Sequence, residues 1–316
     1  MFNELTTPVM VSDFMSIALP IAQSSSPKVS NEILDDKSIN TLAQDALIRL
    51  KAILSTMGQV VVAFSGGVDS ALVLDVAHEI LGDKAVGLTA ISPTFPPEEQ
   101  AIAVEFTEKR GIRHMLVETH ELEDEGYARN EGNRCYFCKS ELFRLATHRA
   151  QKMGVNWVLD GTIVDDLGDH RPGLEAASEN EVRHPLVEAG FNKEMVRTIA
   201  AHRNIHVWNK PSFACLGSRF AVGTRVTLDR ILQVQKVESA LRSVGCIQFR
   251  ARWHKVDDQA MVRIELGNEE MALLLNPVIR ATINDVATTV GFRWVTLDLK
   301  GYQKGNGSLK ESESTD

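Results

Sequence analysis

Hydrophobic positions in residues 40–162 follow two alternating spacings. Apolar side chains three or four positions apart run from residue 42 to residue 54, and the short apolar run QVVVAF follows at 59–64. The same alternation predicts helices at 71–82, 97–111 and 140–154, and buried strands at 84–91, 112–119 and 155–162. Strands that alternate with helices are typical of a parallel sheet with helices on both faces. The pattern therefore predicts a doubly wound, mainly parallel α/β domain.

The pattern changes after a helix predicted at 192–204. The elements that follow have the order helix, strand, strand, helix, strand, at 228–245, 246–254, 260–266, 276–291 and 292–299. This order predicts a second, smaller α+β domain. We expect a flexible extension at 1–39, the α/β domain at 40–210, the α+β domain at 211–304 and a disordered polar tail at 305–316.

Composition and charge narrow the class of protein. The sequence has no run of 18 or more apolar residues, so a membrane span is not expected. Its first apolar stretch has no basic region before it, which is unlike a signal peptide, and we expect a cytoplasmic protein. The formal net charge of -8 disfavours a general nucleic-acid binder and leaves room only for a local basic groove.

The hexapeptide SGGVDS, residues 65–70, stands between the first predicted strand and a helix that starts near Asp69. Gly66 and Gly67 let the backbone approach an anion closely, and the helix N-terminus points free amides at the same place. Ser65 and Ser70 add hydroxyl donors, whereas Asp69 would repel a phosphate unless it caps the turn or holds a divalent ion. These features favour a phosphate-binding loop over a glycine turn with a serine cap, although it lacks the Gly-Lys-Ser/Thr triplet of the Walker pattern.

Two of the four cysteines form a close pair, Cys135 and Cys138, in NRCYFCKSELF immediately before a predicted helix. Two thiolates at this spacing can bind one metal centre, and we expect the helix N-terminus, Arg134 and Lys139 to lower their pKa. A redox pair and an inert buried pair are the alternatives. The pair follows a long loop rather than the first strand of a domain, which counts against the redox pair. Cys246 is expected to be a packing residue at the start of a strand.

A third cysteine, Cys215, lies among small residues in NKPSFACLGSRFAVGTRV, 209–226, outside any predicted helix. By itself this segment leaves open whether Cys215 packs, acts as a nucleophile or is a third metal ligand.

The predicted strand at 246–254 carries two arginines on one face. Period two places Arg250 and Arg252 together, opposite Phe249 and Ala251. Two such arginines can clamp a phosphate with forked hydrogen bonds, and a solvated strand face is the alternative.

Acidic residues crowd the loop after the fourth predicted strand: Asp160, Asp165, Asp166 and Asp169. They can hold magnesium or position a substrate, and a solvated acidic loop is the alternative. His170 and Arg171 stand in the same loop and are assigned no role.

SGGVDS resembles the pyrophosphatase loop of the PP-loop family, with matches at Ser65, Gly66, Gly67, Asp69 and Ser70. Members of that family cleave ATP between its α and β phosphates, adenylate a carboxylate or carbonyl-type oxygen and release pyrophosphate. The resemblance implies an adenine nucleotide alpha hydrolase-like fold at 40–210, with ATP and magnesium as cofactors.

Further segments resemble the LarE family of sulfur transferases, which act in nickel-pincer nucleotide biosynthesis. The similarity runs from about residue 50 to residue 305 and is carried by NRCYFCKSELF, LDGTIVDDLGDHRPGLEAASENEVRHPL, KPSFACLGSRFAVGTRVT and RWVTLDLKGYQKG. It implies a reaction on pyridinium-3,5-biscarboxylic acid mononucleotide, in which ATP adenylates a carboxylate, pyrophosphate leaves, and sulfur replaces AMP to give a thiocarboxylate. It also implies a homo-oligomer.

The family has two branches that supply sulfur differently. One sacrifices a protein cysteine, which becomes dehydroalanine; the other holds a 4Fe–4S cluster on three cysteines, and the unligated iron carries an extra sulfide. Aligned on Ser-Arg-Phe, the sacrificial cysteine falls at Ala214, so the resemblance favours a cluster held by Cys135, Cys138 and Cys215. A fully ligated cluster would leave no place for hydrosulfide. Cys215 as sulfur donor is the second hypothesis, and structural zinc the third.

Other residues match the family's site. Arg250 and Arg252 match residues that bind the substrate phosphate. Glu238 matches a position associated with a divalent ion at a subunit contact. Ser218 and Arg219 match the segment next to the reacting sulfur, where the family's first serine is replaced by glycine at position 217.

Other classes of protein remain alternatives. A tRNA thiolase of the PP-loop family also uses a cluster held by three cysteines, but it needs a basic surface for tRNA, and the net charge of -8 counts against one. An ammonia-using ligase would need a glutaminase domain, which the sequence does not show. A non-catalytic sensor of ATP or of a cluster would tolerate the loss of Asp69 or Ser70, and the loop is intact. The sequence thus favours an ATP-dependent sulfur transferase with a small nucleotide substrate and neither membrane nor nucleic-acid partners.

Overall fold

The computed structural model describes residues 41–168, 172–211 and 214–303. The expected extension at 1–39 and tail at 305–316 lie outside these ranges, as do Asp169, His170 and Arg171. Within the described ranges, no helix combines the length and the apolarity needed to cross a lipid bilayer.

The first sheet has four strands: β1 (Val60–Ala63), β2 (Ala85–Ile91), β3 (Arg113–Glu118) and β4 (Trp157–Leu159). Their order is β3-β2-β1-β4, and every pairing is parallel, with Val60 opposite both Ala85 and Trp157. All four residues of β1 are buried, as in parallel sheets that are covered on both faces. The predicted doubly wound, mainly parallel sheet is confirmed.

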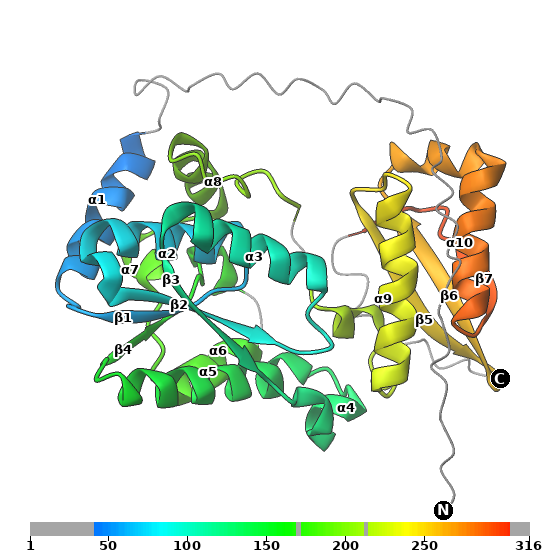
Figure 1. Ribbon diagram of the computed structural model, residues 1–316, viewed down its shortest axis with the longest axis horizontal. Helices are drawn as coiled ribbons and strands as arrows, with labels where there is room; N and C mark the ends of the chain where they lie inside the picture. Colours follow the sequence, from blue (N-terminus) through cyan, green and yellow to red (C-terminus); the bar gives the residue numbers. More distant parts are fainter. Residues whose placement is uncertain (1–40, 169–171, 212–213, 304–316) are drawn as a thin grey trace, which may run out of the picture. The chain divides into compact units, whose positions relative to one another are not determined.

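The helices that accompany this sheet are α1 (Thr41–Ser55), α2 (Val68–Leu81), α3 (Pro97–Arg110), α4 (Glu125–Arg129), α5 (Arg134–Lys152), α6 (Pro172–Glu179), α7 (Pro185–Ala189) and α8 (Lys193–His202). They cover both faces of the sheet, with α1, α2 and α8 on one side and α5 and α6 on the other (Figure 1). Alternate residues of β1 serve the two cores. Val60 and Val62 pack with α1 and α2, and Val61 and Ala63 pack with α5 and α6.

The second sheet has three strands: β5 (Phe249–Val256), β6 (Gln259–Leu266) and β7 (Phe292–Leu297). Strand β5 pairs antiparallel with β6, and β6 pairs parallel with β7. Helices α9 (Leu228–Ser243) and α10 (Pro277–Thr289) share one core with this sheet. The predicted order of helix, strand, strand, helix, strand is therefore confirmed. Phe249 and Ala251 point into that core, so Arg250 and Arg252 lie on the other face, as predicted.

Two predicted element starts were wrong. Helix α5 begins at Arg134 rather than at residue 140, so Cys135 and Cys138 lie in its first turns and not before it. Cys138 packs against the core of the second sheet, and this tertiary contact stabilises the early turns. Strand β5 begins at Phe249, after Cys246, which is buried in the same core and is confirmed as a packing residue.

Short 3-10 helices connect several of these elements: η2 (Gly82–Lys84), η3 (Glu121–Glu123), η4 (Val164–Asp166), η5 (Leu216–Arg219) and η6 (Glu270–Leu275). Cys215 occupies the N-cap position of η5. The segment that carries this cysteine is therefore a single short turn.

Candidate functional site

The loop between β1 and α2 is braced by its own serines. Ser65 N donates to Ser70 Oγ at 3.2 Å, and Ser70 Oγ donates to Gly67 O at 3.2 Å. Gly66 has a φ of 72°, in the left-handed region that glycine adopts without strain. The hexapeptide thus forms the strand, loop and helix start that the sequence predicts, and phosphate binding there stays a prediction.

The loop after β4 lies directly against this hexapeptide. A Cβ built on Gly161 would lie 2.5 Å from Ser70 N and 2.8 Å from Ser70 Cα. Strands β1 and β4 are neighbours, while the chain runs from β1 to β2 on the other side, so the two loops flank the point where the strand order reverses. Open α/β sheets bind their ligands at such a point.

The side chain of Asp69 extends from the start of α2 to Lys193 of α8. Lys193 Nζ donates to Asp69 Oδ1 at 2.8 Å and to Oδ2 at 2.7 Å. Burial raises the pKa of Asp69, and the nearby charge of Asp166 adds to the rise, while Lys193 opposes it. The ion pair neutralises the carboxylate that would otherwise repel a phosphate.

Asp160 is buried and forms a dyad with His184. Its Oδ1 accepts from His184 Nδ1 at 2.7 Å, and its Oδ2 accepts from Thr162 Oγ1 at 2.7 Å. Burial acts to raise the pKa of Asp160, but the hydrogen bond from His184 and the charge of Lys139 bring it below its ordinary value. The hydrogen bond to Asp160 raises the pKa of His184. This dyad fixes the start of the loop that packs against Ser70.

The other described acids of this loop hold backbone amides. Asp166 Oδ2 accepts from Ile163 N at 3.1 Å, and Asp165 Oδ2 accepts from Lys193 N at 3.1 Å. Both carboxylates therefore shape the loop around the hexapeptide.

Cys135 is exposed, whereas Cys138 and Cys215 are half-buried. Burial raises the pKa of the Cys138 thiol, and the nearby charges of Glu121 and Cys215 add to the rise, against Lys139. The expectation that local cations lower the pKa of this pair is wrong for Cys138, because burial and acidic neighbours outweigh the single lysine. Among the described residues, no three His, Cys, Asp or Glu side chains already stand together as metal ligands.

Tyr127 of α4 lies near Cys138 and Cys215, and it shares one core with Cys138 and with Leu216, the residue after Cys215. Its pKa is raised by burial and then by the nearby charges of Cys215 and Cys138. The structure therefore brings Cys215 close to the pair in α5, although the three segments are distant in sequence.

Arg219 holds the Cys215 turn from inside the protein. The arginine is fully buried, and its Nη1 donates to Ala214 O at 2.8 Å, Cys215 O at 3.2 Å and Ser218 Oγ at 2.7 Å. Leu216 N donates to Thr94 O at 2.9 Å, which ties the same turn to the loop after β2.

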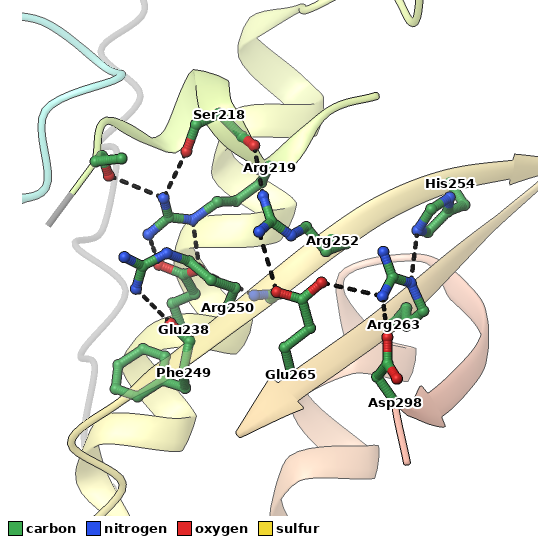
Figure 2. A network of polar contacts seen from close by, with 12 residues as sticks. Ser218, Arg219, Glu238, Phe249, Arg250, Arg252, His254, Arg263, Glu265 and Asp298 are labelled. Carbon is green, nitrogen blue, oxygen red and sulfur yellow. Dashed lines mark hydrogen bonds and ion pairs between the residues drawn. The ribbon is translucent and has the colours of Figure 1, made fainter. Parts of the chain in front are cut away.

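Glu238 of α9 is the counter-ion of Arg219. Arg219 Nε donates to Glu238 Oε1 at 2.7 Å, and Nη2 donates to Oε2 at 2.9 Å (Figure 2). Glu238 Oε1 also accepts from Ala251 N of β5 at 2.9 Å. This carboxylate thus joins α9, β5 and the Cys215 turn, and its predicted role in holding a divalent ion stays a prediction.

Arg252 and Arg250 extend the network along β5 (Figure 2). Arg252 donates through Nη1 to Ser218 O at 2.7 Å and through Nη2 to Glu265 Oε2 at 3.0 Å. Arg250 donates to Phe249 O at 2.6 Å. Burial and the positive charge of Arg219 lower the pKa of Arg250 to about 10, so it stays charged at neutral pH.

Sequence reasoning missed two groups of residues, one in this network and one near the cysteines. Arg263 Nη1 donates to Glu265 Oε1 at 3.0 Å and to Asp298. The alternation along β6 places Arg263 and Glu265 on one face, and this pattern could have identified them from the sequence. Tyr127 and Glu121 carry no local signal, because only the tertiary fold brings them to the cysteines.

The first turn of α3 connects the phosphate loop to the Cys215 segment. Lys210, which leads into that segment, pairs with Glu99 at 2.5 Å. A Cβ on Gly66 would lie 3.4 Å from Glu99 O, so the same helical turn packs against the hexapeptide. Helix α3 therefore contacts both the SGGVDS loop and the residue that leads into the Cys215 segment.

Comparison with known proteins identifies the family. The chain is 37% identical, over 84% of its length and 95% of the relative's, to the pyridinium-3,5-bisthiocarboxylic acid mononucleotide synthase of Lactiplantibacillus plantarum. The chain belongs to the LarE family. It is also 39% identical over 84% of its length to an uncharacterised protein of Synechocystis, covering 97% of that protein. An uncharacterised protein of Methanocaldococcus jannaschii is 25% identical over 78% of the chain and 91% of its own length. No family model matches the chain.

Gly217 stands where the sequence resemblance to the LarE family implies a serine, and its surroundings are crowded. A Cβ at this position would lie 2.3 Å from Tyr127 Oη and 2.8 Å from Arg134 Nη1. In this member of the family, two polar groups occupy the space that a side chain at position 217 would take.

We expect Arg219→Met to lower the free energy of unfolding by about 3–5 kcal/mol, because it leaves Glu238 buried and unpaired. The double change Arg219→Met with Glu238→Met should restore part of that loss. Urea unfolding followed by circular dichroism measures both.

Arg225→Met is the matched control, because Arg225 pairs with Glu125 on the surface at 2.7 Å and should leave the unfolding midpoint unchanged. Equal destabilisation by Arg219→Met and Arg225→Met would show that the buried pair does not hold the Cys215 turn.

Proposed function

We propose that this chain is an ATP-dependent sulfur transferase that acts on pyridinium-3,5-biscarboxylic acid mononucleotide. The relative from Lactiplantibacillus plantarum is a synthase of the corresponding bisthiocarboxylic compound. One structural observation supports the same role here above all others. Arg219 and Arg252 both bind the Ser218 turn, so one buried network joins the cysteine segment to the arginine face of β5.

The phosphate loop supports an adenylation step. A carboxylate oxygen is a poor leaving group. When this oxygen attacks the α-phosphorus of ATP, the α–β phosphoanhydride bond breaks and pyrophosphate leaves. In the next step AMP is then the leaving group at the carboxyl carbon. Ser65, Gly66, Gly67 and Ser70 would hold the phosphates at the N-terminus of α2. Asp69, poised by Lys193, would hold magnesium, which neutralises charge on the pyrophosphate as it leaves.

The arginine face of β5 supports binding of the substrate phosphate. Arg219, Arg252 and Arg263 pair with Glu238, Glu265 and Asp298, and Arg250 lies on the same face beside Arg219. Arg250 stacks on Tyr302 at 5.0 Å and presents a planar guanidinium. A phosphate bound by Arg250 and Arg252 would place the rest of the nucleotide beside the Ser218 turn.

The cysteines support sulfur transfer from a metal centre. Tyr127 lies near Cys138 and Cys215, and the buried Tyr127 Oη and Arg134 Nη1 have no hydrogen-bond partner within the described ranges. Unpartnered donors beside thiols fit an anionic, sulfur-rich group, and Cys135, Cys138 and Cys215 would hold it. Such a group would be a 4Fe–4S cluster with one iron left unligated by cysteine, and it would supply sulfide to the site. Attack of sulfide on the adenylated carboxyl carbon would form the carbon–sulfur bond, and the carbon–oxygen bond to AMP would break.

Sacrifice of Cys215 is the second candidate. Its backbone oxygen is held by Arg219, and Ala214 stands where the family resemblance places the sacrificial cysteine. Structural zinc on the three cysteines is the third candidate. We also propose a homo-oligomer. The family resemblance places Glu238 at a divalent ion at the contact between its subunits.

With ATP, magnesium, sulfide and the biscarboxylic mononucleotide, we expect release of pyrophosphate and AMP and formation of the thiocarboxylate. Asp69→Asn should lower the rate of pyrophosphate release by about 100-fold, because charge stabilisation at the transferring phosphate is lost. Coupled pyrophosphate detection and mass spectrometry of the nucleotide measure the two products.

Glu79→Gln is the control on the same helix, because Glu79 pairs with Lys51 near the surface. Pyrophosphate release without dependence on the carboxylated nucleotide would contradict the proposed substrate. Loss of hydrogen sulfide from Cys215 after one turnover would favour sacrifice over a cluster.

Arg250→Ala should weaken binding of the mononucleotide by roughly 10- to 100-fold, because a charge-assisted contact to the phosphate is removed. Isothermal titration calorimetry measures the dissociation constant.

The nucleoside without its phosphate should bind the wild-type and Arg250→Ala proteins alike, and Arg225→Ala, an exposed arginine, should bind the mononucleotide normally. If Arg250→Ala weakened the nucleoside and the nucleotide equally, Arg250 would not be a phosphate ligand.

A further inference from the structure

The hydroxyl of Tyr127 is a buried donor that no other described residue binds. The residue is only 1% exposed, and its Oη has no hydrogen-bond partner within the described ranges. A phenol removed from water normally keeps a partner for its hydroxyl, because leaving it unpaired costs free energy. Tyr127 packs in one core with Leu216, the residue after Cys215, and Cys138 packs against the same core, so the hydroxyl belongs to the cysteine region.

Arg134 places a second unused donor at the same point. Its Nη1 is buried and also lacks a partner among the described residues. Tyr127 Oη and Arg134 Nη1 would lie 2.3 Å and 2.8 Å from a Cβ at position 217. Two donors from α4 and α5 therefore converge beside Gly217, and they occupy the space that a side chain at this position would need.

We propose that Tyr127 Oη and Arg134 Nη1 bind an anionic sulfur atom beside Cys215, namely the sulfur that is to be transferred. This assignment rests on the proposed function. It adds two binding residues to that function, and it explains why position 217 carries no side chain.

The surroundings favour sulfur over the other anions of the reaction. A phenol and a guanidinium both donate hydrogen bonds, and a phenol is protonated at neutral pH, so the pair suits an acceptor with negative charge. The phosphate of the nucleotide has its own cationic face on β5, around Arg250. The two donors lie instead near Cys138 and Cys215, so a sulfur anion is the reactant that they would meet. Hydrosulfide from solution and the extra sulfide of a cluster are two sources of the same chemistry.

Sulfide binding to anaerobically reconstituted protein tests the assignment. Sodium sulfide is titrated into protein loaded with iron, and bound sulfide is read from acid-labile sulfide per iron and from the visible charge-transfer absorbance. The same titration on protein without iron distinguishes free hydrosulfide from sulfide on a cluster. We expect Tyr127→Phe to weaken sulfide binding about tenfold, the effect of one hydrogen bond to an anion.

Two further variants and one control accompany Tyr127→Phe. Gly217→Ala should weaken sulfide binding by placing a methyl group against both donors, and Arg134→Gln should do so by removing the charge. Tyr136→Phe is the matched control, because the Tyr136 hydroxyl donates to Glu179 at 2.8 Å on the surface. It should bind sulfide as the wild type does.

Each other outcome overturns the assignment. Sulfide binding unchanged in both Tyr127→Phe and Arg134→Gln would show that the donors do not touch sulfur. Normal sulfide binding with weakened binding of the mononucleotide would assign the donors to the substrate carboxylate. Wild-type protein that releases pyrophosphate with the mononucleotide but binds no added sulfide would overturn the assignment and leave the adenylation step standing.

Discussion

The buried ion pair between Arg219 and Glu238 is the interaction on which the rest of the site depends. Removing both charges from water is costly, and the cost is offset only where every donor finds an acceptor. Arg219 meets this condition with two bonds to Glu238 and three to the turn that carries Cys215. A turn of four residues with little secondary structure of its own is thereby held in one position.

The same pair holds the Cys215 turn beside the arginine face of β5. Glu238 also accepts from Ala251 N, so the strand that carries Arg250 and Arg252 is fixed by the same carboxylate as the turn. Arg252 adds a second connection through Ser218 O. A residue change that released Arg219 would therefore disturb the cysteine, the serine and the arginine face together.

The two halves of the proposed reaction meet through α3. Glu99 reaches Lys210, and Glu98 pairs with Arg242 of α9 at 2.7 Å. The backbone of the same helix packs against Gly66 of the phosphate loop. Neighbouring residues of one helix thus support both the loop proposed for adenylation and the turn proposed for sulfur transfer.

Local pattern was enough to predict both sheets, their helices and the alternation along β5, because period and capping act over a few residues. It also found the hexapeptide and the cysteine pair. It did not reveal helices α6 and α7, which lie at 172–189 where no helix was predicted, or the early start of α5. Tertiary contacts stabilise these short helices and the first turns of α5. The predicted lowering of the Cys138 pKa was wrong for a related reason, because the residues that bury the thiol, and Glu121 beside it, belong to distant segments. No local sequence pattern predicts that Tyr127 and Arg134 converge on Gly217.

The metal content of protein purified and reconstituted without oxygen tests the central claim most directly, namely that the Cys215 turn presents sulfur from a metal centre. We predict iron and acid-labile sulfide in the ratio of one 4Fe–4S cluster per chain, with loss of both in Cys135→Ala, Cys138→Ala and Cys215→Ala. Zinc without iron, or iron that persists when all three cysteines are replaced, would contradict the claim.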